Sequence, residues 1–163
     1  MKHTISVLVE NKAGVLSRIS GLFARRGFNI DSLAVGPTED KNISRITLLV
    51  EGDDYIAEQV TKQLNKQIDV IKVKKLNQQE ITRRELVLVK VKMTAAQRGE
   101  IIDIVKIMQG QIVDLSHTTM TVEMCDRPDK IDILIELLSQ YNIIEVARTG
   151  TIALQKGPES VSV

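Results

Sequence analysis

The side chains that most often do chemistry in enzymes are few in this chain, and they lie far apart in the sequence. It has two histidines, His3 and His117, and one cysteine, Cys125. Neither histidine has a cysteine or a carboxylate at the spacing of a metal site, so we expect both to be ordinary strand or hairpin residues. Cys125 ends an apolar segment and has no base nearby in the sequence. We predict that it is a small buried hydrophobic residue.

Two acidic clusters, GDD at 52–54 and DRPDKID at 126–132, have the residue types of a metal site. Each cluster directly precedes a segment with helical periodicity. A carboxylate that caps a helix and interacts favourably with its dipole is therefore the simpler interpretation. The sequence also contains no phosphate-binding glycine loop and no nucleophile-elbow motif. We predict no catalytic residue, no metal ligand and no cofactor in this chain.

The segment with the clearest potential for binding is NKAGVLSRISGLFARRGFNI, residues 11–30. Backbone N–H groups at the start of a helix are unpaired and carry the positive end of the dipole, so they bind carboxylates. Gly14 lacks a Cβ and lets a ligand approach this backbone closely. Asn11 offers a donor and an acceptor to the charged groups of an amino acid. Asn29 follows the other end of the helix, where it can complete a site across a symmetric interface with a second copy.

A purely local role also accounts for these residues. In that alternative Asn11 caps the helix, Gly14 eases the turn and Asn29 occupies a left-handed turn. The N-x-x-G spacing alone does not separate the two interpretations.

These residues are positioned by a pattern of elements that occurs twice. The first copy comprises a strand at 5–10, a helix at 14–27, strands at 29–38 and 44–52, a helix capped by Asp53 or Asp54, and a strand at 69–76. The second comprises a strand at 85–93, a helix opened by a capping box of Thr94 and Gln97, a hairpin at 110–126, a helix capped by Asp126 with Pro128 in its first turn, and a strand at 143–154. The order βαββαβ predicts an α+β protein with two tandem ferredoxin-like domains.

The predicted boundaries are a first domain at 1–77, a polar linker at 78–84, a second domain at 85–156 and a flexible tail at 157–163. Domains of about 75 residues bury only about 60% of their unfolded surface. Their sheets also have edge strands that need a partner. We therefore expect the chain to associate, most simply as a homodimer.

Composition limits the class of protein. Hydrophobic residues make up 43% of the chain and charged residues 26%, with a net charge of +1, so we expect no nucleic-acid or membrane surface. Apolar runs are far shorter than the roughly 20 residues of a membrane span. The first ten residues enter a strand pattern at once, which leaves no room for a signal peptide. A single cysteine fits a reducing compartment, and we expect a cytoplasmic protein.

The segment ISVLVENKAGVLSRISGLFARRGFNIDSLAVGPTED at 5–40, together with TRRELVLVKVK and IIEVARTG further on, resembles a known family. The family is the small, regulatory subunit of acetolactate synthase, also called acetohydroxyacid synthase. The resemblance implies an N-terminal ACT domain, a second ferredoxin-like domain, pairing of two small subunits through their ACT domains, and valine bound at that interface. The family's ligand loop matches Asn11, Gly14, Val15 and Leu16. Its contribution from the neighbouring protomer matches Asn29, with Ile30 beside it.

The resemblance also implies a division of labour. The family's large subunit carries thiamine diphosphate, Mg²⁺ and often FAD, and it condenses pyruvate with a second 2-oxo acid. The small subunit has no catalytic residue, activates the large one and confers feedback inhibition. Three other functions remain open on the residues alone: a free-standing ACT-type sensor that controls another enzyme or a transcription factor, a small ferredoxin-like enzyme, and an assembly subunit without a ligand.

Overall fold

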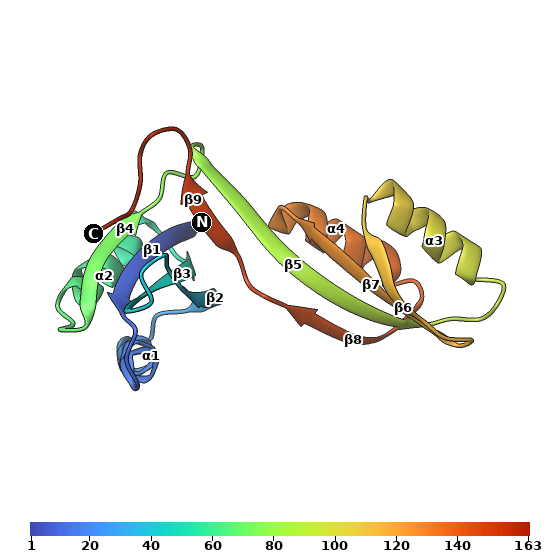
Figure 1. Ribbon diagram of the computed structural model, residues 1–163, viewed down its shortest axis with the longest axis horizontal. Coiled ribbons are helices and arrows are strands. Elements are labelled where there is room, and N and C mark those ends of the chain that lie inside the picture. Colours follow the sequence, from blue (N-terminus) through green and yellow to red (C-terminus); the bar gives the residue numbers. More distant parts are fainter. The chain divides into compact units, whose positions relative to one another are not determined.

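A computed structural model describes residues 1–163, which divide into two compact units (Figure 1). The first unit comprises Met1–Thr82 and Thr151–Val163, and the second comprises Arg83–Gly150. Each unit has one antiparallel sheet and two helices in the order βαββαβ. The predicted α+β class and the twofold repeat are therefore confirmed. No helix is both long and apolar enough to cross a membrane.

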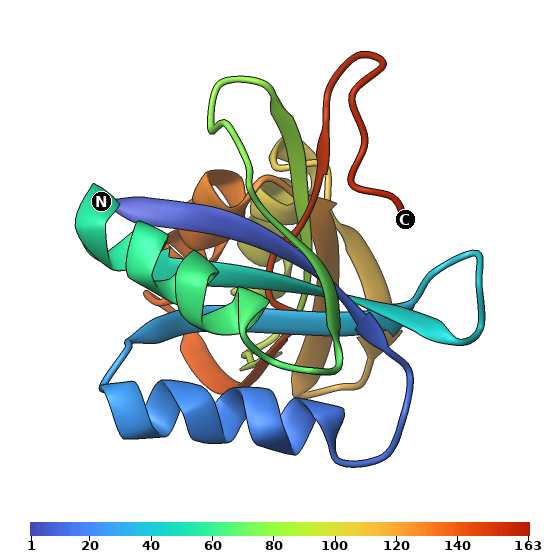
Figure 2. The ribbon, with the colours of Figure 1, turned by 90° about the vertical axis from the view of Figure 1, so that its left-hand side faces the viewer.

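The first unit contains β1 (Lys2–Glu10), α1 (Val15–Arg26), β2 (Ile30–Pro37), β3 (Ile43–Glu51), α2 (Asp54–Asn65) and β4 (Val70–Lys75). Its strands lie in the order β2-β3-β1-β4. Figure 2 shows α1 and α2 on the same side of this sheet. Alternate residues of β1 and β3 point toward the helices and are fully buried with them, which forms an aliphatic core.

Helix α1 begins and ends as its sequence predicts. Val15, Ile19, Leu22 and Phe23 form its buried stripe. Gly27 has φ +66°, and its N–H donates to the Ala24 carbonyl, which ends the helix. The next strand can therefore start within a few residues.

Helix α2 is capped by the first aspartate of the GDD segment. The Asp53 side chain accepts a hydrogen bond of 2.9 Å from the Ile56 N–H. Asp54 forms an ion pair with Lys75, and this pairing lowers the pKa of the Asp54 carboxyl. Both carboxylates thus have structural partners, as the cap interpretation predicts.

The helix-free face of the first sheet is covered by two segments that lie outside the six main elements. Residues 76–82 and 151–163 pack there through a cluster of apolar side chains, namely Leu8, Leu76, Ile81, Ala153 and Val161. Under this cover Thr4 and Ser6 of β1 are fully buried.

Three cations from β3 and β4 fix the end of the chain to this face. Arg45 donates to the Ser6 hydroxyl at 2.7 Å and to the Val161 carbonyl at 2.8 Å. Lys72 donates to the Ser162 carbonyl at 2.8 Å, and Lys74 pairs with Glu159 at 2.9 Å. The structure therefore packs residues 157–163 against the first unit, where the sequence pattern predicted a flexible tail.

The second unit contains β5 (Ile81–Lys92), α3 (Arg98–Ile107), β6 (Gln111–Leu115), β7 (Thr119–Asp126), α4 (Pro128–Leu138) and β8 (Asn142–Arg148). Its strands lie in the order β6-β7-β5-β8. Valine and methionine side chains of β5 and β7 face α3 and α4 and are buried, and they form the second core.

The predicted strand at 143–154 is two strands in the structure. β8 ends at Arg148, and Gly150 adopts φ +79° before β9 (Ile152–Gln155) begins. β9 pairs with β5 and belongs to the first unit. Its apolar alternation continues that of β8, so the periodicity alone did not reveal the break. In the same way β5 begins at Ile81, inside the predicted linker.

The two predicted caps of the second unit have different outcomes. The reciprocal bonds of the capping box form, since the Thr94 N–H donates to the Gln97 side chain at 3.0 Å and the Gln97 N–H to the Thr94 hydroxyl at 3.4 Å. They lie in the turn before α3, whose N-cap is Gln97 without a side-chain cap. Asp126 is not the N-cap of α4. That position is Arg127, whose N–H donates to the Asp126 carboxylate at 2.7 Å, and Pro128 opens the helix. Since proline has no N–H, the first turn has one donor fewer to satisfy.

Candidate functional site

The N-terminus of α1 lacks the side-chain cap that most helices have. Gly14 occupies the N-cap position with φ +84°, a left-handed conformation that favours glycine, and no side chain hydrogen-bonds to the first turn. The Gly14, Leu16 and Ser17 N–H groups have no partner in the chain, and all three residues are exposed. The helix therefore presents free donors, at the positive end of its dipole, to an acceptor from outside.

Asn11 does not provide the missing cap, because it is engaged elsewhere. Its side-chain amide donates to the Lys41 carbonyl at 2.8 Å, and its backbone N–H donates to the Asn42 carbonyl at 2.7 Å. These bonds join the loop before α1 to the β2–β3 turn. The alternative in which Asn11 caps the helix is therefore wrong.

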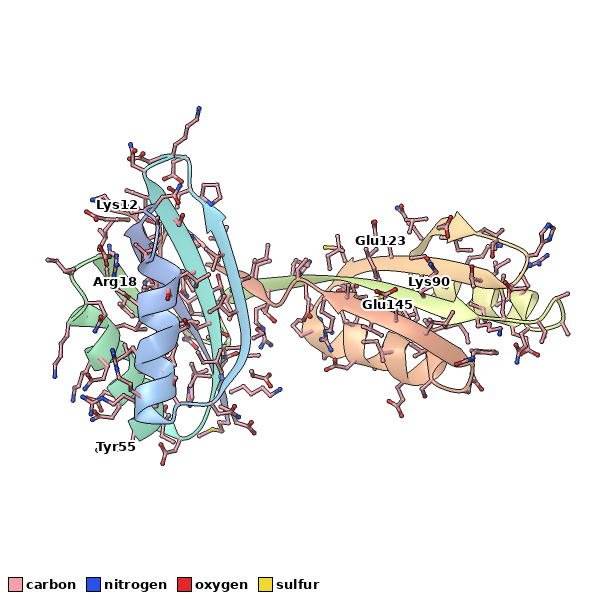
Figure 3. All side chains as sticks on the ribbon, turned by 90° about the horizontal axis from the view of Figure 1, so that it is seen from below. Lys12, Arg18, Tyr55, Lys90, Glu123 and Glu145 are labelled. Atoms are coloured by element: carbon pink, nitrogen blue, oxygen red, sulfur yellow. The ribbon has the colours of Figure 1, made fainter.

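Two basic side chains lie beside this helix start (Figure 3). Arg18 contacts the Asp69 carboxylate through Nε and Nη2, at 2.7 and 2.6 Å. Its Nη1 lies only 3.1 Å from the position that a Cβ on residue 14 would occupy. Lys12 donates to the Glu10 carboxylate at 2.8 Å, and this hydrogen bond raises the pKa of the ammonium.

Because both cations are paired with carboxylates, the free N–H groups and the helix dipole are what make the helix start favourable for an anion. Arg18 is not among the residues predicted for the site. Its position four residues after Gly14 was the available signal, because residues four apart share a helix face.

Asn29 lies beyond the opposite end of α1. Its side-chain amide contacts the Glu51 carboxylate at 3.5 Å, a long hydrogen bond. A helix of 12 residues is about 18 Å long, so one chain does not bring Asn29 near Asn11. Asn29 also has no positive φ, because Gln109 is the one non-glycine residue with that conformation. The alternative of a left-handed turn at Asn29 is therefore wrong.

The apolar residues of the predicted site differ in what they can offer. Val15 is 4% exposed and belongs to the core, so only its backbone is available. Leu16 is 44% exposed beside the free N–H groups. Ile30 is half-buried at the start of β2 and packs against the core. Leu16 and Ile30 thus offer apolar side chains at opposite ends of α1, about 18 Å apart in one chain.

The remaining candidates do not converge on a second site. His3 is buried on β1, with Nδ1 4.0 Å from an Asp54 carboxylate oxygen, and His117 is exposed in the β6–β7 hairpin. Cys125 is exposed, so the prediction that it is buried is wrong. Its neighbour Met124 takes the core position, and strand alternation turns Cys125 to the opposite face.

Two family models together match nearly the whole chain. The model described as an AHAS small subunit-like ACT domain matches residues 5–72, which include every residue of the predicted ligand site. The model described as the small subunit of acetolactate synthase matches residues 84–157.

Curated relatives and a solved structure agree with these matches. A probable acetolactate synthase small subunit of Archaeoglobus fulgidus is 50% identical over 96% of this chain and 98% of its own length. The acetolactate synthase small subunit of Mycolicibacterium smegmatis is 46% identical over 98% of this chain and 94% of its own. The crystal structure of the small subunit from Thermotoga maritima is 37% identical, with a TM-score of 0.91 over 98% of this chain and 99% of that one.

Proposed function

Since this chain belongs to the family of acetolactate synthase small subunits, we propose that it activates a separate catalytic subunit and makes that subunit sensitive to valine. The ACT domain, the regulatory role and the place in branched-chain amino acid biosynthesis follow from the family. On this proposal the catalytic subunit, in the cytoplasm, carries thiamine diphosphate, Mg²⁺ and FAD. This chain supplies the effector site and no catalytic residue.

The main observation in support of a valine site is the uncapped start of α1. The free N–H groups of Gly14, Leu16 and Ser17 suit the carboxylate of an amino acid, because they are unpaired donors at the positive end of the helix dipole. The absence of a Cβ at Gly14 leaves the space that a close approach requires. The carboxylate binds there, and the Leu16 side chain contacts the isopropyl group.

A second copy completes the site. Within one chain α1 separates Asn11 from Asn29, so the two asparagines meet only if the helices of two copies run in opposite directions across a twofold axis. Asn29 and Ile30 of one copy then face the Gly14 loop of the other. The asparagine side chains and nearby carbonyls accept hydrogen bonds from the valine ammonium.

Binding between two copies provides the regulation. A ligand that both chains hold favours one relative arrangement of the two copies. It changes the activity of the catalytic subunit only to the extent that its affinity differs between that arrangement and the alternative one. Coupling free energies of about 1–3 kcal/mol are typical, which corresponds to roughly 5–150-fold in affinity.

Gly14→Asp tests the site directly. The new carboxylate lies beside Arg18 and the free N–H groups, where it competes with the carboxylate of valine. We expect activation of the catalytic subunit to persist while the valine concentration for half-inhibition rises about tenfold or more. The assay is reconstitution with a cognate catalytic subunit across a valine titration.

Gly157→Asp is the matched control, because Gly157 is also left-handed, with φ +72° and open space around its Cβ, but lies in the C-terminal segment. Unchanged valine sensitivity in the Gly14 variant would remove the helix start from the site. If the wild-type chain neither activates nor confers valine inhibition, the proposed function itself fails.

Asn29→Ala tests the contribution of the second copy. Asn29 is exposed in the single chain, and the second copy buries it in the proposed site. Its loss then leaves buried partners unpaired and weakens valine binding by about 1–3 kcal/mol, measured by isothermal titration. Asn65→Ala, at the exposed end of α2, serves as the control. Equal affinities in the two variants would exclude a site shared between copies.

A further inference from the structure

Arg18 uses only one edge of its guanidinium within the chain. Its Nε and Nη2 contact one carboxylate oxygen of Asp69, at 2.7 and 2.6 Å, and no hydrogen bond in the chain involves Nη1. Because a guanidinium is planar and rigid, engagement of one edge fixes the direction of the remaining N–H bonds. The two N–H bonds of Nη1 are therefore unpaired donors whose position Asp69 determines.

Asp69 is itself held in place by the first sheet. It lies in the loop between α2 and β4, and its carbonyl accepts a hydrogen bond of 2.9 Å from the Glu10 N–H at the end of β1. The Asp69 side chain is only 14% exposed, whereas the Arg18 side chain is 51% exposed. The guanidinium thus has a fixed anchor and remains accessible at the surface of α1.

The free edge of the guanidinium lies beside the start of α1 (Figure 3). Nη1 is 3.1 Å from the position that a Cβ on Gly14 would occupy. A Cβ is about 2.5 Å from the backbone nitrogen of its own residue, so Nη1 and the Gly14 nitrogen are at most roughly 5.6 Å apart. A carboxylate accepts at about 2.9 Å with each of its two oxygens, so one carboxylate can bind both donors at this separation.

We propose that Nη1 of Arg18 donates to the carboxylate of the effector, which makes Arg18 a specificity-determining residue of this site. In the proposed function, on which this assignment rests, that carboxylate lies on the free N–H groups at the start of α1. Since Asp69 neutralises the charge of Arg18, the contribution is a directed hydrogen bond from an ionised donor rather than a long-range attraction. The site then selects amino acids with a free carboxylate, because an amide would turn an N–H group toward one of these donors and leave it unpaired.

A bracing role for Arg18 leads to a different expectation. If the ion pair with Asp69 only holds the loop before α1 in place, loss of Arg18 weakens every ligand of the site by the same factor. If Nη1 contacts the carboxylate, the loss affects valine and spares valinamide, in which a neutral amide replaces the carboxylate. The ratio of the two affinities therefore distinguishes contact from bracing.

Replacing Arg18 by lysine or by glutamine in the full chain tests the contact. Both replacements keep a donor for Asp69, but neither has a second edge that points toward Gly14. Isothermal titration then measures the affinity of the parent and variant chains for valine and for valinamide. We expect the preference for valine over valinamide to fall about tenfold or more in both variants, while the affinity for valinamide changes less than about twofold.

Arg127→Lys and Arg127→Gln are the matched controls. Arg127 also pairs with an aspartate, Asp129, at 3.1 Å, and its side chain is 56% exposed, close to the 51% of Arg18. It lies in the second unit, which contains none of the predicted site residues. The same chemical changes there should leave the affinity for both ligands unchanged.

The outcomes separate this proposal from the proposed function. If both Arg18 variants keep the parent's preference for valine, or lose affinity for the two ligands by the same factor, Arg18 does not bind the carboxylate and the proposal is overturned. A parent chain that binds the two ligands equally well also overturns it, and leaves a valine site of another kind. A parent chain that binds no valine overturns the valine site of the proposed function, and this proposal with it.

Discussion

Replacing Val161 by alanine measures how strongly the end of the chain stabilises the first unit. Val161 is 5% exposed and packs in the apolar cluster that includes Leu8, Leu76 and Ile81. Its carbonyl also accepts a hydrogen bond from Arg45, which the substitution leaves in place. The change therefore isolates the burial of the side chain.

The magnitude follows from the atoms removed. Valine to alanine deletes two buried carbon atoms, each worth about 0.8 kcal/mol, so the first unit should lose about 1.5 kcal/mol of its free energy of unfolding. Val163→Ala makes the same chemical change at a residue that is 82% exposed, and it should cost less than about 0.5 kcal/mol.

Hydrogen exchange is the suitable assay, because two units need not unfold together and exchange reports each strand separately. A loss of about 1.5 kcal/mol corresponds to roughly tenfold faster exchange of the β1 amides. The β7 amides of the second unit should be unaffected. If Val161→Ala and Val163→Ala give the same β1 exchange rates, the C-terminal segment does not stabilise the first unit and this reasoning is refuted.

Two further predictions concern the second unit. Arg148 contacts the Glu85 carboxylate at 2.6 and 3.1 Å, and Glu85 is 4% exposed. Arg148→Met leaves this carboxylate buried and unpaired, and should lower the free energy of unfolding by about 2–4 kcal/mol in chemical denaturation. Lys62→Met, which breaks an exposed pair, should lower it by less than about 0.5 kcal/mol. The Arg127 N–H, which donates to Asp126, lowers the pKa of that carboxyl below its ordinary 3.8. Ionised Asp126 therefore stabilises the fold above about pH 4, and this contribution is lost as the pH falls through 3.8 and below. Acid titrations of unfolding should show a shallower decline for Asp126→Asn than for the parent chain, and identical curves would contradict the assignment.

The repeat of βαββαβ was predictable because its elements obey local rules. The buried stripe of α1, the Asp53 cap and the Thr94–Gln97 bonds all depend on residues a few positions apart, in or just before one helix. The same rules did not locate the end of the second unit, because the apolar alternation runs through the Gly150 break into β9. Long-range packing decides which unit a strand joins, and the hydrophobic periodicity of the strand gives no information about that packing.

The candidate site was predictable in its types of residue but not in its contacts. Gly14 was predicted to let a ligand approach the helix start, and it lies there with a left-handed backbone, whereas the N-x-x-G spacing left open whether Asn11 caps the helix. Nothing in the spacing revealed that Asn11 bonds to the Lys41 carbonyl, 30 residues away, or that Arg18 lies over the loop. Partners at such separations are fixed by the tertiary fold rather than by neighbouring residues.

The position of the second unit in the chain bears on how the protein can be dissected genetically. A stop codon anywhere between residues 83 and 150 removes the part of the second unit that follows it and also the segment from Thr151 onward that seals the first sheet. Loss of regulation in such truncated proteins is therefore no measure of the second unit's own role. An internal excision that splices residue 82 to residue 151 is the informative deletion, and the pairing of β9 with β5 holds those two cut ends on neighbouring strands.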